Sequence, residues 1–466
     1  MKIVFVGGGA HRYLSVARSV LAEQKVVDKG EICVYDLNAT RANAMAGMIQ
    51  KSPEFKSSGC IVTCPDSLDI ALNGANVVCV VLMAGNRLNY ELSTVTCNKY
   101  GFIGSDQLSP SGAFLALKGG PILLDIAKRM EKLCPDAWLI DFANPVAVLS
   151  ATVNNHTKIR CLGVCAGYTN HLWDLSRILG KDEEAQNIQA NSAGINHMAF
   201  ILKDSKIGDE DLYDVINAHI ATDWKMPELS PRWNAASRGN IMNSVTTLLR
   251  LYKKFGVLVF SSESDGLAHL DIEGIYNEGA NHRINTTIEE IEKHLNSSLK
   301  SRQNSDEIFQ SHLNREMTEA EWNTEYPERL YLLREDQNVM TKIIMAAAGV
   351  DELRIATSYP NYGAVAGFKD RTVLEYSQII YKNTIRAAGQ FEIPDVLHGL
   401  VSALATHQTL LGDAIATGDP RVLYEALYCY PVKQDTNDAK QLWRELLVQS
   451  ADELNPAFQK TIEYLI

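Results

Sequence analysis

The sequence lacks both an excess of positive charge and any long apolar run. It contains 44 Lys and Arg against 56 Asp and Glu, which gives a formal net charge of -12. Non-specific binding to nucleic acid needs a basic surface, so we expect no nucleic-acid partner. The apolar run at 77–84 is far shorter than a membrane span, and the opening "MKIVFVGGGAH" is too short and too glycine-rich for a signal peptide. We therefore expect no membrane partner.

The sequence also lacks a paired cysteine motif. Its nine cysteines are scattered, odd in number and without a C-x-x-C pair. This usage is typical of reduced thiols, so we expect a cytoplasmic protein without structural disulfides. The remaining composition is ordinary, with 46% hydrophobic and 21% charged residues over 466 positions. A chain of this length and composition can bury a large core and favours two domains.

Short apolar runs alternate with helical patterns in the first part of the chain. The runs "KIVFVGG", "EICVYDL", "CIVTCPD", "NVVCVVLMAG", "AWLIDFANP" and "RCLGVCAG" are typical of buried parallel strands. Longer helical patterns follow, at 335–348 and 397–416, and the Asn-rich interval 300–306 is expected to be a loop or helix junction. We predict an α/β protein: a doubly wound Rossmann domain like that of lactate and malate dehydrogenases at 1–192, then a mixed α+β, mostly helical domain at 193–466.

A glycine loop directly follows the first predicted strand. Gly7, Gly8 and Gly9 stand where a doubly wound sheet brings its backbone close to a pyrophosphate, although Arg12 replaces the third glycine of the full motif. Asp36 ends the second strand, where a carboxylate accepts hydrogen bonds from a ribose diol. This combination favours NAD over its 2′-phosphorylated form. The alternative is a tight turn and helix cap without a ligand.

Polar residues follow several of the other predicted strands. Asn144, Cys165 and the loop from 85 to 112 are expected at the carboxyl edge of the sheet, where ligands of such folds bind. Taken alone, Asn144-Pro145 is equally explained by a turn and Cys165 by a buried thiol. His197, in the apolar run "SAGINHMAF", is equally explained as a core histidine satisfied by hydrogen bonds.

Several motifs together resemble glycoside hydrolase family 4, the NAD- and metal-dependent glycosidases. They are "GGGAHR" with "VYDLN", "KYGFIGSDQLSPSG" with "GGPILLDIAKRM", "FANPVAVLS", "GVCAG", "AGINHMAF" and "SYPNYGAV", in matching order from about residue 1 to residue 430. The loop "GSDQLSPSG" is closer to the branch of α-galactosidases and α-galacturonidases than to the 6-phosphoglucosidases. The resemblance also suggests a homodimer or homotetramer.

The resemblance implies a metal site and an unusual hydrolytic route. Cys165 and His197 would bind a divalent metal, usually Mn2+. Asn196 and Asn144 would form hydrogen bonds with the sugar hydroxyls or orient the metal ligands. The family oxidises C3 of the sugar with NAD+, removes the C2 proton, eliminates the C1 substituent, adds water and re-reduces C3. The cofactor is therefore not consumed. The implied cofactor-binding residues are Gly7, Gly9, His11, Arg12, Asp36 and Asn144.

The base and the acid are less determined by the resemblance. Asp265 is the best match for the base, and Glu263, His269 and Tyr276 are the alternatives. Many α-specific members carry Asp or His after the metal cysteine, whereas this chain has Ala166. Asp106 or Tyr168 could replace the missing acid. Otherwise, the enzyme could need an activated substrate or prefer another anomer. Asp106 is also explained as the N-cap of a helix.

Other residues are candidate sugar contacts. Asn361 in "YPNYG" is expected to border the pocket, although a turn explains it equally well. Arg87, Arg283 and Arg334 could bind an anionic substituent or simply form salt bridges. Three other functions stay open: an NAD-dependent 2-hydroxy-acid dehydrogenase, a sugar oxidoreductase that releases NADH, and a catalytically inactive NAD-binding sensor.

Overall fold

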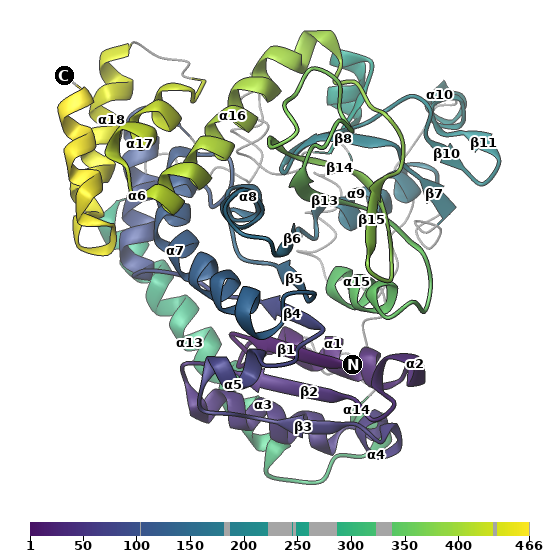
Figure 1. Ribbon diagram of the computed structural model, residues 1–466. Coiled ribbons are helices and arrows are strands. Elements are labelled where there is room, and N and C mark those ends of the chain that lie inside the picture. Colours follow the sequence, from purple (N-terminus) through teal and green to yellow (C-terminus); the bar gives the residue numbers. More distant parts are fainter. Residues whose placement is uncertain are drawn as a thin grey trace.

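The computed structural model describes residues 1–102, 104–180, 187–221, 245, 248–260, 287–322, 338–431 and 436–465. Figure 1 shows a sheet that runs through the molecule, with helices on its faces and a helical layer at the C-terminal end. No helix within these described ranges combines the length and the apolar character that crossing a membrane requires.

The N-terminal half of the sheet is parallel and has the strand order of a Rossmann domain. Its six strands lie in the order β3-β2-β1-β4-β5-β6, with all pairs parallel. This order reverses direction between β1 and β4, which is where such folds bind dinucleotides. The predicted fold class is thus confirmed. The strands are β1 Lys2–Val6, β2 Glu31–Tyr35, β3 Ile61–Thr63, β4 Val77–Val80, β5 Trp138–Asp141 and β6 Arg160–Gly163.

Both faces of the parallel strands are buried, which explains why their sequences are continuously apolar. Along β1, Ile3 and Phe5 pack in one core with α1 and α3, and Val4 and Val6 pack in another with α5, α7 and α8. Helices on both sides of a parallel sheet require this pattern. The helices of this half are α1 Arg12–Leu21, α2 Gln24–Val27, α3 Ala39–Lys51, α4 Pro53–Ser58, α5 Leu68–Leu72, α6 Arg87–Lys99, α7 Pro110–Leu133, α8 Val146–His156 and α9 Gly167–Ile178.

Antiparallel strands extend the same sheet beyond β6. The order continues β6-β13-β14-β8-β9-β12, with β15 also paired to β14. A small second sheet contains β11, β10 and β7. The predicted boundary at residue 192 stays a prediction, and the main sheet continues across it. The bounds are β7 Ile188–Gln189, β8 Ser192–Ile195, β9 Met198–Ile201, β10 Lys206–Ile207, β11 Glu210–Asp211, β12 Leu258–Phe260, β13 Leu353–Pro360, β14 Val373–Tyr381 and β15 Thr384–Ala387.

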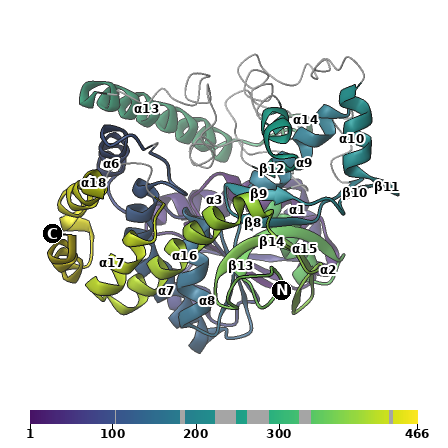
Figure 2. The same cartoon turned by 90° about the horizontal axis from the view of Figure 1, so that it is seen from above.

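The remaining helices cover the C-terminal part and reach back to the N-terminal half. Long α16 packs on α7, α8 and α17, whereas α13 lies against α3 and α6 (Figures 1 and 2). The expected loop at 300–306 is wrong, because these residues lie inside α13, where polar side chains are tolerated on a mostly exposed helix. The helices are α10 Leu212–Ala221, α13 Ile288–Leu313, α14 Glu319–Trp322, α15 Val339–Ala347, α16 Asp395–Thr417, α17 Pro420–Tyr428 and α18 Thr436–Gln449.

Candidate active site

The glycine loop is held tightly between β1, β2 and β4. Gly7 has φ +71°, and a Cβ there would lie 1.8 Å from the carbonyl oxygen of Val81. Only glycine can therefore occupy this position. The N–H of Gly9 donates to Asp36 Oδ2 at 3.0 Å, and the N–H of Asn38 donates to Asp36 Oδ1 at 2.8 Å. Each carboxylate oxygen can accept a further bond, so Asp36 can still bind a hydroxyl.

The positive end of the dipole of α1 lies beside this loop, although the N–H groups of Tyr13 and Leu14 already donate to the carbonyls of Ala10 and His11. His11 is the N-cap residue, yet its side chain makes no capping hydrogen bond. An uncapped helix N-terminus next to a glycine loop is suited to a pyrophosphate. The guanidinium of Arg12 lies over the ring of Phe142 at 4.5 Å, which fixes Arg12 near the end of β5. The glycine loop, His11, Arg12 and Asp36 thus surround one edge of the sheet.

Cys165 and His197 are brought together across 32 residues. The Sγ atom of Cys165 lies 3.8 Å from Nε2 of His197, and the N–H of Gly167 donates to the same sulfur at 3.4 Å. Two ligands of one divalent ion lie about 3–4 Å apart when one is sulfur and the other nitrogen. Within the described ranges, no group of three or more His, Cys, Asp or Glu is placed to hold a metal. The pair would thus leave coordination positions open.

His197 is presented by a tight hairpin turn. Ile195 of β8 pairs with Met198 of β9, so Asn196 and His197 are the two turn residues between them. His197 has φ 66°, a left-handed conformation that is uncommon for a residue with a side chain. Strain of this kind concentrates at functional sites. Burial of β8 and β9 makes the base of the turn rigid, as the apolar flanks of "GINHM" predict.

Glu375 fixes the other turn residue and was not found from the sequence. Asn196 donates its Nδ2 to Glu375 Oε2 at 2.9 Å, and Glu375 is buried on β14. Burial raises the pKa of Glu375 to about 7, although the hydrogen bond from Asn196 and the proximity of His197 lower it. Within the part of the chain that the structure describes, no group donates a hydrogen bond to the buried Oδ1 atom of Asn196. Such an acceptor is available to a ligand, because buried polar atoms in proteins are nearly always hydrogen-bonded.

Asn144 forms a hydrogen-bonded group with the loop after α6. It donates Nδ2 to Asp106 Oδ2 at 2.7 Å, and Gln107 donates Nε2 to Asn144 Oδ1 at 2.5 Å. The peptide bond between Asn144 and Pro145 is cis. The N-cap of α7 is Ser109, whose hydroxyl accepts from Gly112, so Asp106 does not serve as the N-cap. Asp106 is therefore held at the carboxyl edge by Asn144, and its role in a site stays a prediction.

Helix α9 directs different residues to the Cys165–His197 pair and to a separate cavity. A Cβ on Gly167 would lie 3.5 Å from Cys165 Sγ and 4.0 Å from His171, so the Gly167 and His171 side of α9 faces the pair. Burial lowers the pKa of His171 to about 3, and His197 acts in the same direction.

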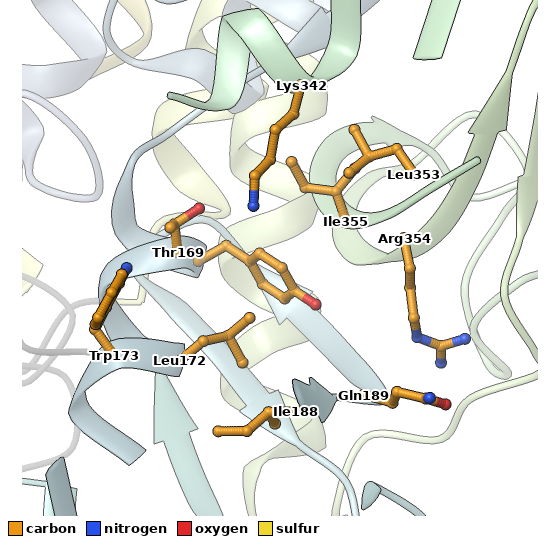
Figure 3. Close-up of a pocket in the computed structure, with 10 residues that line it drawn as sticks. Thr169, Leu172, Trp173, Ile188, Gln189, Lys342, Leu353, Arg354 and Ile355 are labelled. Atoms are coloured by element: carbon orange, nitrogen blue, oxygen red, sulfur yellow. The ribbon is translucent and has the colours of Figure 1, made fainter. Parts of the chain in front are cut away.

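Tyr168 lines the cavity of about 240 Å³ in Figure 3, with Lys342 and Arg354. Burial raises the pKa of Tyr168 to about 12. Asp106 and Tyr168 therefore both stay predictions for the acid that Ala166 does not supply.

Two predicted sugar contacts make bonds within the protein, and the role of Arg87 stays a prediction. Arg87 pairs with Glu91 at 2.9 Å, which corresponds to the salt-bridge alternative. Asn361 is fully buried, and its amide bonds the backbone of Val365 and Phe368. Because β13 runs antiparallel to β6, its end at Pro360 lies at the opposite sheet edge from Cys165. The expectation that Asn361 borders the pocket is corrected on this ground.

The remaining predicted residues lie outside the described residues. They are the base candidates Asp265, Glu263, His269 and Tyr276 and the possible anion-binding residues Arg283 and Arg334. The described part of the site nevertheless contains a glycine loop, a Cys–His pair and an Asn–Asp pair.

The family models agree with this combination. The model described as "Family 4 glycosyl hydrolase" matches residues 2–180, and that of its C-terminal domain matches residues 192–432.

The chain belongs to family 4 of the glycosyl hydrolases.

It is thus a glycosidase of family 4, and relatives cover nearly its full length. The α-galacturonidase of Thermoanaerobacter italicus is 24% identical over 473 residues, covering 96% of this chain and 95% of the relative. The α-galactosidase of Bacillus subtilis is 25% identical over 441 residues, covering 92% and 93%. Both names lie in the branch that the loop "GSDQLSPSG" indicates.

Solved structures confirm the fold of this family 4 chain. A 6-phospho-α-glucosidase from gut microorganisms, solved with NAD and Mn2+, has a TM-score of 0.77 at 16% identity and covers 97% of this chain and 99% of its own. A lactate dehydrogenase from a deep-sea metagenome library has a TM-score of 0.51 at 11% identity and covers 89% and 98%. The predicted similarity to lactate dehydrogenases is therefore confirmed at the level of the fold.

Proposed function

We propose that this family 4 chain hydrolyses a small glycoside by the oxidation, elimination and re-reduction route outlined above, with NAD and a divalent metal. The observation that carries the proposal is the approach of Cys165 Sγ and His197 Nε2 to 3.8 Å beside the carboxyl edge of a Rossmann sheet. A dehydrogenase that only transfers hydride needs no such pair. A glycosidase with two flanking carboxylates needs no dinucleotide loop.

The residues present fit both groups. The glycine loop has no room for a Cβ at Gly7. Asp36 accepts a hydrogen bond from this loop and would also accept hydrogen bonds from the ribose hydroxyls of NAD. A thiolate and an imidazole can both bind a divalent transition metal, and the positions that they leave open can take the oxygen ligands that Mn2+ prefers. The buried Oδ1 of Asn196, to which no described residue donates, lies in the same turn as His197. Bound NAD+ would supply a hydride acceptor, and the bound cation a Lewis acid for the sugar oxygens.

The chain's own residues then handle protons and orientation. Asn144, fixed by Asp106 and Gln107, orients the sugar at the end of β5. Asp265 removes the proton from C2, with Tyr276 as the alternative base. Asp106 donates the proton to the leaving group, because Ala166 carries no titratable atom and the other side of α9 places Tyr168 in a separate cavity. General acid and base groups each contribute about 10²–10⁴-fold to such reactions.

The substrate we propose is an α-galactoside or α-galacturonide. The support comes from the names of the two relatives above and from the loop that contains Asp106. The alternative function is an oxidoreductase that stops after hydride transfer. It stays open because Ala166 removes the acid that many α-specific members use.

A single assay separates these functions. The purified protein is incubated with NAD+, Mn2+ and p-nitrophenyl α-galactoside or α-galacturonide, and nitrophenol and NADH are followed together. The proposal predicts catalytic nitrophenol release without net NADH, and its loss after chelation. Stoichiometric NADH without nitrophenol would instead identify an oxidoreductase. Full activity after exhaustive chelation would contradict the requirement for a divalent metal.

A further inference from the structure

Asp306 on α13 contacts the proposed cofactor site from a distant part of the sequence. Its Oδ2 lies 2.7 Å from Nη1 of Arg41, which is 265 residues earlier, and its Oδ1 lies 3.1 Å from Nε2 of His11. Phe309 stacks on the ring of His11 with centroids 4.4 Å apart and planes inclined by 3°. Helix α13 therefore lies directly against the glycine loop and the start of α3 (Figure 2).

Arg41 stands where it could decide between two nucleotides. Its Nη2 donates to the carbonyl of Gly9 at 3.2 Å, and a Cβ on Gly9 would lie 2.6 Å from Arg41 Cβ and 3.1 Å from Asp36 Oδ2. Arg41 and Asp36 thus flank the same glycine. In dinucleotide-binding folds the acid at this strand end binds the ribose hydroxyls of NAD, whereas a nearby arginine accommodates the 2′-phosphate of NADP.

We propose that Asp306 is a determinant of the preference for NAD+ over NADP+. It engages Arg41, the cation that a 2′-phosphate would use, and it adds a second negative charge to that of Asp36. With Arg41 the three side chains carry a net charge of about minus one, which repels a phosphate of about two negative charges. The inference rests on the proposed NAD site and adds a specificity residue to it.

The test is a titration of both nucleotides by intrinsic tryptophan fluorescence, without substrate. Removing one charge near a doubly charged phosphate in a nearly aqueous medium changes affinity about fivefold, and release of Arg41 adds to this. Asp306→Asn should therefore bind NADP+ about tenfold more tightly and NAD+ within about twofold of the wild type. Adding Arg41→Ala to this variant should remove the gain for NADP+.

Two control variants separate charge from the packing of α13. Asp69→Asn removes a carboxylate that pairs with Arg129 at 2.8 Å with similar exposure, and should leave both affinities unchanged. Phe309→Ala weakens the contact of α13 with His11 but keeps the charges, so the ratio of the two affinities should stay constant. Equal effects of Asp306→Asn on both nucleotides would overturn the proposal and leave Asp306 a purely structural role. If the wild type binds neither nucleotide, the proposed function itself fails, and this inference with it.

Discussion

Glu375 provides a test of how the proposed metal ligands Cys165 and His197 are positioned. Its buried carboxylate accepts the amide hydrogen of Asn196, which precedes His197 in the two-residue turn. Removing the carboxylate leaves Asn196 Nδ2 without its acceptor, so the amide can rotate and the strained φ of His197 loses support. A hydrogen bond to a charged group contributes about 1.5–3 kcal/mol, and partners behind metal ligands typically change affinity about 10–100-fold.

We therefore expect Glu375→Ala to weaken Mn2+ binding about 10–100-fold, and Glu375→Gln to stay within about threefold because its amide oxygen still accepts from Asn196. The metal-free protein is titrated with Mn2+, and free Mn2+ is measured by electron paramagnetic resonance. Circular dichroism checks that both variants are folded at the temperature of the titration. Unchanged affinity in Glu375→Ala would refute this positioning role. Equal losses in both variants would show that the hydrogen bond is not its basis.

Three further predictions concern the metal, the base and the fold. His197→Ala should lose Mn2+ but retain NAD+ binding, and chelated wild type should regain activity with Mn2+. A His197→Ala variant that still binds Mn2+ would refute the role of His197 as a metal ligand. Asp265→Asn should lower turnover by about two to four orders of magnitude with NAD+ binding intact, and near-normal turnover would favour Tyr276, Glu263 or His269. Asp413→Asn should reduce the free energy of unfolding by about 1–3 kcal/mol at neutral pH in urea titrations, because buried Asp413 accepts from His156 and Arg371.

The last prediction also has a pH dependence. Burial opposes ionisation of Asp413, but the hydrogen bonds from His156 and Arg371 outweigh it and lower the pKa of the carboxyl group. A lowered pKa means that the stabilisation is present above the ordinary carboxyl pKa and is lost as the pH falls through the lowered value. The difference in stability between wild type and Asp413→Asn should thus shrink in acid. A difference that grows as the pH falls would contradict the assignment.

Local patterns were sufficient for the parallel half of the fold. The apolar runs of β1 to β6, the glycines after β1 and Asp36 after β2 could each be predicted from a short stretch of sequence. Each of these features depends only on its own strand and the turn that follows it. The approach of Cys165 to His197 was predicted from the family resemblance, and the structure brings the two side chains to 3.8 Å.

The residues that the sequence did not reveal depend on antiparallel or distant packing. Glu375 reaches Asn196 only because β14 pairs with β8, and nothing near residue 375 signals this partner. Asp306 reaches Arg41 because the polar interval 300–306 is part of a helix rather than a loop. Asn361 was misplaced for a similar reason, since the direction of β13 relative to β6 decides which sheet edge its end approaches.

The central claim is that the glycosidic bond is broken after a proton leaves C2, and hydrolysis in D2O tests this most directly. The released sugar is isolated, and deuterium at C2 is measured by nuclear magnetic resonance. Removal of the C2 proton by a base followed by return of a solvent proton predicts deuterium at C2 in the product. Product formed at full rate with hydrogen retained at C2 would contradict the account, because displacement at C1 alone leaves that position untouched.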